Sequence, residues 1–285
     1  MNVAIITDTT VDWAIQDCQR KNVTMVPLKV CFGEETHLDQ YQISSEEFYA
    51  KMQASENLPT TSQPSPSDFA QEFGRLHAEG YDAAICLHIA PPLSGTAQSA
   101  QIAAQDAPMP VHVLETNGTT AHLGLLLDAA CQLRDEGCTL DQMVERLAAY
   151  QKRIGILLCP ETLDNLVRGG RFPEGAATQA AMLNIRMLLT LDEEGRVAPF
   201  DKVKGAKGQI SRCAAFVQDY IQENGPCCLR ITHSQAQKSV DALVKALDEM
   251  GADYQLVSVD YCGATIATHL GMGAYCVAVA PRQVA

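Results

Sequence analysis

The segment Ala83-Ala84-Ile85-Cys86-Leu87, followed after a short loop by Leu93-Ser94-Gly95-Thr96, decides the fold class. The first part is a run of apolar residues, which predicts a buried strand. The second part holds a Ser-Gly turn, and a helix is predicted from about Thr96 onward. A buried strand, a tight turn and a helix in this order are typical of a βαβ unit in a parallel sheet.

The same alternation extends on both sides of this segment. Two helices have start signals in which a serine is followed three residues later by an acidic residue, Ser44 with Glu47 and Ser65 with Asp68. Further elements are predicted as strands at 3–6, within 23–31 and at 111–115, and as helices at about 119–136 and 140–152. Residues 1–153 are therefore predicted to form an α/β domain with a mainly parallel sheet flanked by helices.

A second domain is predicted for residues 154–285, because the strand pattern changes there. Residues 187–191 and 197–203 are joined by Asp192-Glu193-Glu194-Gly195, which predicts an antiparallel hairpin. Helices and strands then alternate to the end of the chain, at about 208–223, 227–232, 235–249, 253–259, 262–269 and 274–280. This arrangement predicts an α+β domain with a mixed sheet.

The composition excludes several classes of protein. The chain of 285 residues is 47% hydrophobic and carries a net charge of −13, which argues against sequence-independent binding of nucleic acid or of an anionic membrane. Its eleven cysteines include no Cys-x-x-Cys and no metal-site spacing, so they are interpreted as reduced core residues. Neither a signal peptide nor a membrane-spanning helix of about 18 apolar residues is recognisable, so a soluble cytoplasmic protein without integral membrane association is expected.

Two hydroxyl-bearing segments indicate an anion site. They are Thr60-Thr61-Ser62-Gln63-Pro64-Ser65 and Leu93-Ser94-Gly95-Thr96, and each is predicted to lie in a loop that leads into a helix. Backbone N–H groups at a helix start, together with a hydroxyl, suit an anion. Ligands also gather at the carboxyl ends of parallel strands, where two more polar clusters are expected, Asp8-Thr9-Thr10 and Glu115-Thr116-Asn117. For any one cluster alone, ordinary turn and cap chemistry is the favoured alternative.

Arg171 and His269 are further candidates. Gly169-Gly170 lets the backbone turn sharply and deliver the Arg171 guanidinium to a site, although a helix C-cap with a solvated arginine is the simpler interpretation. His269 precedes two glycines and could donate a hydrogen bond to an anion, or could merely interact with a helix dipole. No phosphate-binding loop, nucleophile elbow or zinc pattern is recognisable, and the sequence assigns no base to Ser94. Binding is therefore predicted rather than catalysis.

In order and along its whole length, the chain resembles the DegV family of bacterial fatty-acid-binding proteins. The resemblance rests on an ordered set of segments, of which no single one is diagnostic: Asp8-Thr9-Thr10, Val26-Pro27-Leu28, Thr61-Ser62-Gln63-Pro64-Ser65, Leu93-Ser94-Gly95-Thr96, Gly169-Gly170-Arg171, Lys204-Gly205 and His269-Leu270-Gly271-Met272-Gly273. The chain departs from the family pattern at Ala90-Pro91-Pro92 and at Met272, where the family has serines and a proline.

The resemblance implies an acyl carrier without a cofactor or metal. A long-chain fatty acid such as palmitate, stearate or oleate would lie in a buried tunnel between the two domains. A partner fatty acid kinase would phosphorylate its carboxylate, which supplies phospholipid synthesis, so catalysis would belong to the partner. The residues expected to hold the carboxylate are Thr61, Ser62, Ser94, Thr96 and His269, with Arg171 at the mouth and the N–H of Gly95 added at the helix start. The alternatives are an enzyme that uses the same anion site, such as a phosphotransferase or esterase with a reactive Ser94 or His269, and a regulatory module whose lipid is structural.

Overall fold

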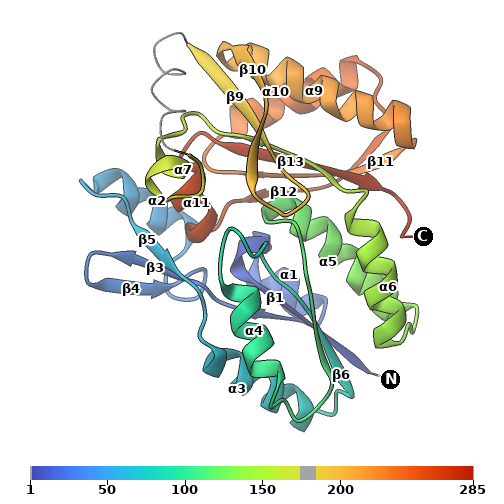
Figure 1. Ribbon diagram of the computed structural model, residues 1–285. Coiled ribbons are helices and arrows are strands. Elements are labelled where there is room, and N and C mark those ends of the chain that lie inside the picture. The colour runs from blue at the N-terminus through green and yellow to red at the C-terminus, as the bar shows by residue number, and fades with distance from the viewer. Residues whose placement is uncertain (1, 174–183, 285) are drawn as a thin grey trace.

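A four-stranded parallel sheet forms the base of the N-terminal half in the computed structural model, which describes residues 2–173 and 184–284 (Figure 1). Its strand order is β2-β1-β6-β7, and every neighbouring pair is parallel. The strands are β1 (Val3–Asp8), β2 (Val23–Val26), β6 (Ala83–Leu87) and β7 (Val111–Leu114). The parallel α/β arrangement predicted from the alternation of strands and helices is confirmed.

A six-stranded mixed sheet lies in the C-terminal half, in the order β10-β9-β8-β13-β11-β12. The predicted hairpin is present, since β9 and β10 pair antiparallel, whereas β11 and β12 are parallel. The strands are β8 (Gly155–Cys159), β9 (Ile185–Leu191), β10 (Val197–Lys204), β11 (Cys227–His233), β12 (Tyr254–Tyr261) and β13 (Tyr275–Pro281).

A small third sheet corrects one prediction. Its order is β4-β3-β5, built from β3 (Lys29–Phe32), β4 (Glu35–Leu38) and β5 (Thr60–Ser62). The segment that holds Thr61 and Ser62 was predicted to be a loop, but it is strand β5, and Thr61 pairs with Val30. Its polar residues show no apolar alternation, so only the pairing with β3 makes it a strand.

The helices begin and end where local signals place them. Capping boxes are present at Ser44, Ser65 and Thr139, and Pro66 occupies the first turn of its helix. The helices are η1 (Thr9–Val11), α1 (Ile15–Arg20), α2 (Ser45–Ala54), α3 (Pro66–Ala78), α4 (Thr96–Ala104), α5 (Thr120–Asp135), α6 (Leu140–Gln151), α7 (Asp164–Arg168), α9 (Gly205–Asn224), α10 (Gln237–Glu249) and α11 (Ala264–Leu270). Within the described part of the chain, none of them combines the length and apolarity that a bilayer crossing requires.

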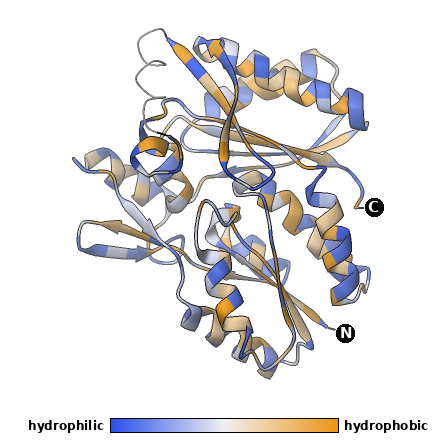
Figure 2. Cartoon of the chain, viewed as in Figure 1, coloured by the Kyte–Doolittle hydropathy of each residue, from blue (hydrophilic) through white to orange (hydrophobic). Residues whose placement is uncertain are grey.

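Helix α5 lies between the two large sheets (Figure 1). One hydrophobic cluster contains residues of β1, β6, α5 and α6 together with Ala278 and Ala280 of β13. Outer helices such as α6 and α9 alternate between hydrophilic and hydrophobic residues, as expected for helices with one face in water (Figure 2). The two sheets thus share an interior, and the domain boundary at residues 153 and 154 stays a prediction.

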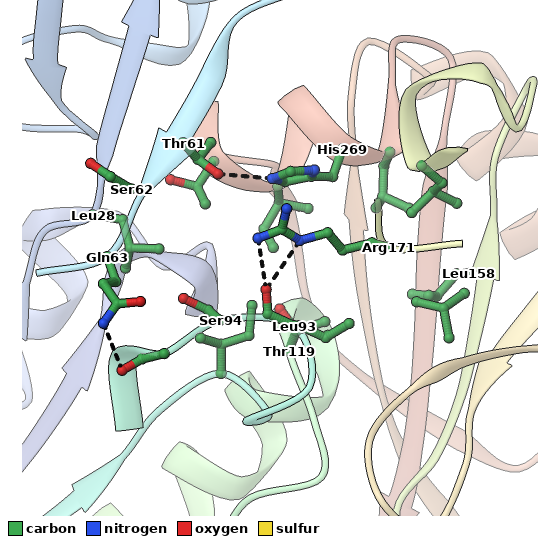
Figure 3. A pocket seen from close by; sticks show the side chains of 17 residues that line it. Leu28, Thr61, Ser62, Gln63, Leu93, Ser94, Thr119, Leu158, Arg171 and His269 are labelled. Carbon is green, nitrogen blue, oxygen red and sulfur yellow. Dashed lines mark hydrogen bonds between the residues drawn. The ribbon is translucent and has the colours of Figure 1, made fainter. Parts of the chain in front are cut away.

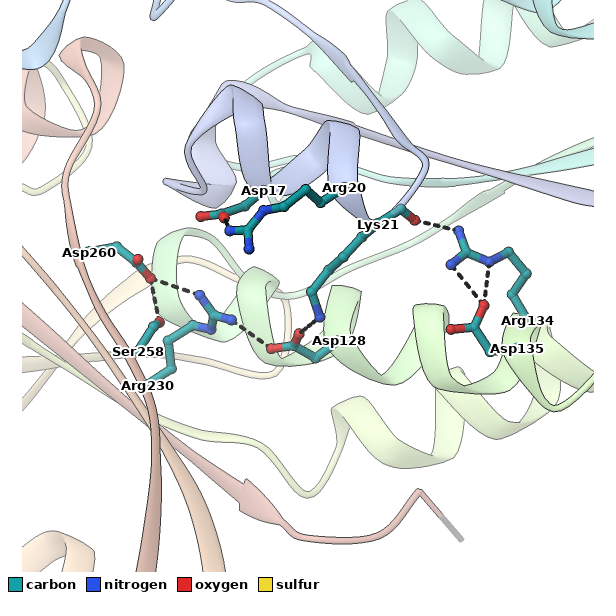
Figure 4. Close-up of polar contacts among 9 residues, drawn as sticks. All are labelled: Asp17, Arg20, Lys21, Asp128, Arg134, Asp135, Arg230, Ser258 and Asp260. Carbon is teal, nitrogen blue, oxygen red and sulfur yellow. Dashed lines mark hydrogen bonds and ion pairs between the residues drawn. The ribbon is translucent and has the colours of Figure 1, made fainter.

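A buried arginine strengthens the contact between helix α5 and the six-stranded sheet (Figure 4). Arg230 of β11 donates to Asp260 of β12 at 2.8 Å and to Asp128 of α5 at 2.7 Å. Its guanidinium also lies 4.9 Å from the centre of the Trp13 ring. Asp128 accepts a further bond from Lys21 at 3.0 Å. Because the arginine is 5% exposed and has two carboxylate partners, its burial is compensated by charge-assisted hydrogen bonds.

Candidate functional site

A cavity of about 290 Å³ opens where β5, the loop before α4, the segment after α7, and α11 meet (Figure 3). Most of its lining is apolar, from Leu28, Ile89, Leu93, Leu158, Leu166, Val197, Ile266 and Leu270. Six of the seven predicted site residues also line it, namely Thr61, Ser62, Ser94, Gly95, Arg171 and His269. An apolar cavity with a few converging polar groups is the usual form of a small-molecule site.

Thr96 lies beside the cavity rather than in its lining. It is fully buried in the first turn of α4. Its hydroxyl lies 2.9 Å from the Ser94 hydroxyl, so it orients the residue that does line the cavity. Because Thr96 contributes no cavity surface, the prediction that it contacts a ligand directly has no support in the structure.

His269 and Thr61 form the centre of the polar side. His269 lies in the last turn of α11, and its Nε2 is 2.8 Å from Thr61 Oγ1 on β5 (Figure 3). Burial, with a smaller contribution from the Arg171 charge, lowers the pKa of His269 to about 4. The imidazole is therefore neutral at neutral pH. When Nε2 carries the proton, it donates to Thr61 Oγ1, and the Thr61 hydroxyl can donate onward to an anion.

Arg171 is anchored rather than solvated. Helix α7 ends at Arg168 with Gly169 as its C-cap, and Gly170 has a φ of +70°, which lets the chain reverse toward the cavity. The guanidinium donates from Nε and Nη2 to the Leu93 carbonyl, at 3.2 and 3.1 Å, and from Nη1 to the Gly169 carbonyl at 2.6 Å. Since a guanidinium has five N–H groups, two remain for a ligand. The simpler interpretation was a helix C-cap followed by a solvated arginine: the cap is present at Gly169, but the arginine is bonded to two carbonyls rather than solvated.

Gln63 is a site residue that the sequence prediction missed. Its Nε2 donates to the Gly95 carbonyl at 3.1 Å and to Ser99 Oγ at 2.9 Å. The close approach requires Gly95, because a Cβ there would lie 2.2 Å from Gln63 Oε1. Gln63 therefore joins the two hydroxyl-bearing segments to each other. Its position within the Thr60–Ser65 segment was the available signal.

Two buried carboxylates from the N-terminal half hold the start of α11. Asp39 accepts from the backbone N–H groups of Ala264 and Thr265, both at 2.9 Å, and Asp12 accepts from that of Gly263 at 2.8 Å. Burial raises the pKa of both carboxyl groups. Their role is to fix the helix whose other end carries His269, and no sequence pattern identified them.

The remaining polar clusters hold loops. Asp8 accepts from the backbone N–H groups of Thr10 at 2.9 Å and Ile89 at 3.0 Å, and Thr116 donates to the His88 carbonyl. Neither cluster lines the cavity, so the expectation that all four polar clusters share one ligand site is correct only for the Thr61 and Ser94 segments. Within residues 2–173 and 184–284, no group of His, Cys, Asp and Glu has the geometry to hold a metal ion.

Gly169→Ala should disturb the site through one contact. A Cβ at Gly169 would lie 2.4 Å from His269 Nδ1 and 3.0 Å from the Asn165 carbonyl oxygen, so the imidazole must move. We expect a loss of about 1–3 kcal/mol in the free energy of unfolding, measured with urea. Gly74→Ala is the control, because nothing lies within 4 Å of its Cβ position in α3. That change should stabilise the protein by about 0.5–1 kcal/mol. Equal effects at the two positions would contradict the predicted contact.

Comparisons with known proteins match nearly the whole chain. A family model described as "Uncharacterised protein, DegV family" matches residues 2–282. The chain belongs to the DegV family. A DegV domain-containing protein of Streptococcus pyogenes serotype M6 is 33% identical over 283 residues, which cover 99% of this chain and all of the relative.

Two solved DegV structures share the whole fold. A DegV family protein from Thermus thermophilus, described for its fatty acid binding, has a TM-score of 0.91 at 31% identity and covers 99% of this chain and 100% of its own. A fatty acid binding DegV family protein from Streptococcus agalactiae has a TM-score of 0.89 at 28% identity, with the same coverage. The predicted family and fold class are thereby confirmed.

Proposed function

We propose that this DegV protein binds a long-chain fatty acid, with its chain in the apolar cavity and its carboxylate against Thr61, Ser94 and His269. The observation that carries this proposal is that one cavity combines an apolar lining with a hydroxyl–imidazole pair and Arg171. The fatty acid binding named for the Thermus and Streptococcus agalactiae relatives supports it.

The energetics suit a carrier. Burial of one methylene contributes about 0.8 kcal/mol, so a long acyl chain supplies on the order of 10 kcal/mol before the costs of association. A hydroxyl contact adds about 1 kcal/mol, and roughly twice that to an anion. The apolar lining would therefore set the affinity, and the polar groups would set the orientation of the carboxylate. A neutral His269 allows this with one formal positive charge, on Arg171, close to the headgroup.

The carrier would present the carboxylate to a partner kinase, and the chain itself would perform no chemistry. The hydrogen bonds of the site support this division. Ser94 Oγ is bonded to Thr96 Oγ1, and His269 Nε2 is bonded to Thr61 Oγ1, so no described contact pairs Ser94 with a base. Turnover of an acyl phosphate or ester by the isolated protein would favour the enzymatic alternative.

Native mass spectrometry of the protein as purified tests the proposal directly. A retained fatty acid, removable by delipidation and restored by added palmitate, is the expected result. A protein that neither retains nor takes up a fatty acid would remove the basis of the carrier assignment.

Ser94→Ala should weaken fatty acid binding modestly. The change removes one hydroxyl from the lining and leaves the apolar lining intact, so we expect about a five- to tenfold rise in Kd for palmitate. Fluorescence titration against delipidated protein measures it. Ser67→Ala is the matched control, since Ser67 is an exposed residue of α3 that lies outside the cavity lining. A loss of more than about a hundredfold at Ser94 would show that the hydroxyl, rather than the apolar lining, dominates the affinity.

A further inference from the structure

A second pocket, of about 590 Å³, adjoins the apolar cavity on the six-stranded sheet. On β8, Leu158 lines the cavity and Ile156 lines the pocket, and residues two apart lie on the same face of a strand. Across the β9–β10 hairpin, Val197 lines the cavity and pairs with Leu191, which lines the pocket. The two spaces are therefore neighbours on one face of the sheet. The second space is here called the distal pocket.

The distal pocket lies away from the polar end of the cavity. Thr61 and His269 line the cavity but are not part of the lining of this pocket, and Figure 3 shows Leu158 across the cavity from Thr61. Helix α5 connects the two spaces, because Thr119 lines the cavity and its carbonyl accepts from the N–H of His122, which lines the pocket, at 3.1 Å. An acyl chain with its carboxylate against Thr61 and His269 therefore directs its other end, the ω end, toward the distal pocket.

His122 is a buried polar side chain of the distal pocket that lacks a partner. It is 4% exposed, and no residue in the described part of the chain forms a hydrogen bond with its imidazole. A Cβ at Gly118 would clash with Nδ1, so backbone covers this edge of the ring and Nε2 is the nitrogen left for the pocket. Burial lowers the pKa of His122 to about 4, so the ring is neutral at neutral pH. A ligand group that bonds to Nε2 would remove the cost of leaving it unpaired.

The other groups of the distal pocket favour a neutral ligand group. Its lining includes the carboxylates of Asp192 and Glu193 and one ammonium group, that of Lys152, so a further carboxylate is disfavoured there. A hydroxyl suits a neutral imidazole, because each of them can donate or accept a hydrogen bond. The Thr190 hydroxyl also lines the pocket. It donates to a backbone carbonyl of β8 at 2.9 Å and keeps lone pairs for a second donor.

We infer that the distal pocket binds a hydroxyl group at the ω end of the acyl chain and that His122 recognises it, so that the ligands of this protein include ω-hydroxy fatty acids. The inference rests on the proposed function, because the carboxylate must lie at the opposite end of the cavity. The methyl end of a plain fatty acid leaves the imidazole unpaired, whereas an ω-hydroxyl pairs with it. His122 is therefore a specificity-determining residue for the chain and takes no part in holding the carboxylate.

Isothermal titration of delipidated protein with pairs of acids tests the inference. Each pair consists of a saturated fatty acid and its ω-hydroxy form, and the pairs run from laurate to stearate so that one of them matches the length of the site. In the parent protein, the ω-hydroxy acid of the best-fitting pair should bind at least as tightly as the plain acid. His122→Leu should lower the affinity for this ω-hydroxy acid about tenfold and change that for the plain acid less than about twofold.

Two variants and one spectroscopic measurement serve as controls. His122→Gln keeps a donor and an acceptor, so it should retain most of the affinity for the ω-hydroxy acid. His112→Leu removes a half-buried histidine that lines neither the cavity nor the distal pocket, and it should leave both affinities unchanged. Nitrogen-15 NMR of the parent protein needs no variant: the Nε2 resonance of His122 should shift more with the ω-hydroxy acid than with the plain acid.

The outcomes separate this inference from the proposed function. If plain acids bind but His122→Leu leaves the affinity for ω-hydroxy acids unchanged, or weakens both ligands equally, the inference alone is overturned. The same holds if every ω-hydroxy acid binds the parent protein more than about tenfold more weakly than its plain counterpart. Tighter binding of an α,ω-dicarboxylic acid than of the ω-hydroxy acid would show that the pocket takes an anion, against the assignment to a neutral group. A parent protein that binds no acid of the series would overturn the proposed function itself.

Discussion

Val197→Trp should abolish the loading of fatty acid. Val197 lies near the start of β10, an edge strand of the six-stranded sheet, and lines the apolar cavity. An indole at this position would occupy space that the acyl chain needs. Displacing about four methylenes from the cavity costs about 3 kcal/mol, which corresponds to a rise of about a hundredfold in Kd. Co-purifying lipid, measured by native mass spectrometry, should disappear.

Ala198→Trp is the matched control for this effect. Successive residues of a strand point to opposite faces, and Ala198 is not part of the cavity lining. Both positions are half-buried on the same edge strand, so their effects on folding should be similar. Ala198→Trp should keep its bound lipid. If both variants retain lipid and bind palmitate like the parent protein, the acyl chain does not lie in this cavity.

Acid should weaken the fold through two buried histidines. Burial lowers the pKa of His122 to about 4, and burial together with Arg171 lowers the pKa of His269 to about 4. The unfolded chain, in which a histidine has a pKa of about 6.5, binds its proton first as the pH falls. The stability that each neutral histidine contributes to the fold is therefore fully present above pH 6.5 and is lost progressively as the pH falls toward 4. At about pH 5 each histidine should lower the free energy of unfolding by about 2 kcal/mol.

The measurement is a difference between variants, because other buried groups act in the opposite direction. The raised pKa values of Asp12 and Asp39 make the folded protein bind protons more tightly than the unfolded chain, so acid favours the fold at these two positions. Urea unfolding of the parent protein, His122→Gln and His269→Gln at about pH 7 and about pH 5 isolates each histidine. Identical pH dependence in all three proteins would contradict the assignment.

A bound fatty acid should change only one of these contributions. A carboxylate beside His269 favours the imidazolium and raises the pKa of this histidine. Bound palmitate should therefore reduce the loss of unfolding free energy at low pH, both in the parent protein and in His122→Gln. It should have no such effect in His269→Gln. A ligand effect that survives in His269→Gln would place the carboxylate away from this histidine.

Local signals were sufficient for much of the fold. The segment Ala83–Thr96 correctly predicted a buried strand followed by a helix, and the Ser65-Pro66 start marked α3. Such features depend on a few neighbouring residues, so the sequence displays them directly. The small third sheet was missed, because the three residues of β5 are all polar and form a strand only through their pairing with β3. Pairing between distant segments is not visible in a local pattern.

The residues of the candidate site that could be predicted are those with a polar functional group in the side chain. Hydroxyls at Thr61 and Ser94 and the imidazole of His269 were identified in advance, and all three line the cavity. Apolar lining residues such as Leu158 were not, because a leucine that faces a cavity has the same sequence signal as a leucine packed in a core. Asp39 was also missed, because its role depends on N–H groups that lie 225 and 226 residues further along the chain.

The hydrogen bond between Thr61 and His269 joins positions separated by 208 residues. The segment that holds Thr61 is therefore synthesised well before α11, which carries His269. Until α11 has been made, the apolar residues that it covers stay exposed to water or are sheltered by a chaperone. A ligand of the proposed kind can be enclosed only once both walls of the site have left the ribosome, so its loading would follow the synthesis of α11.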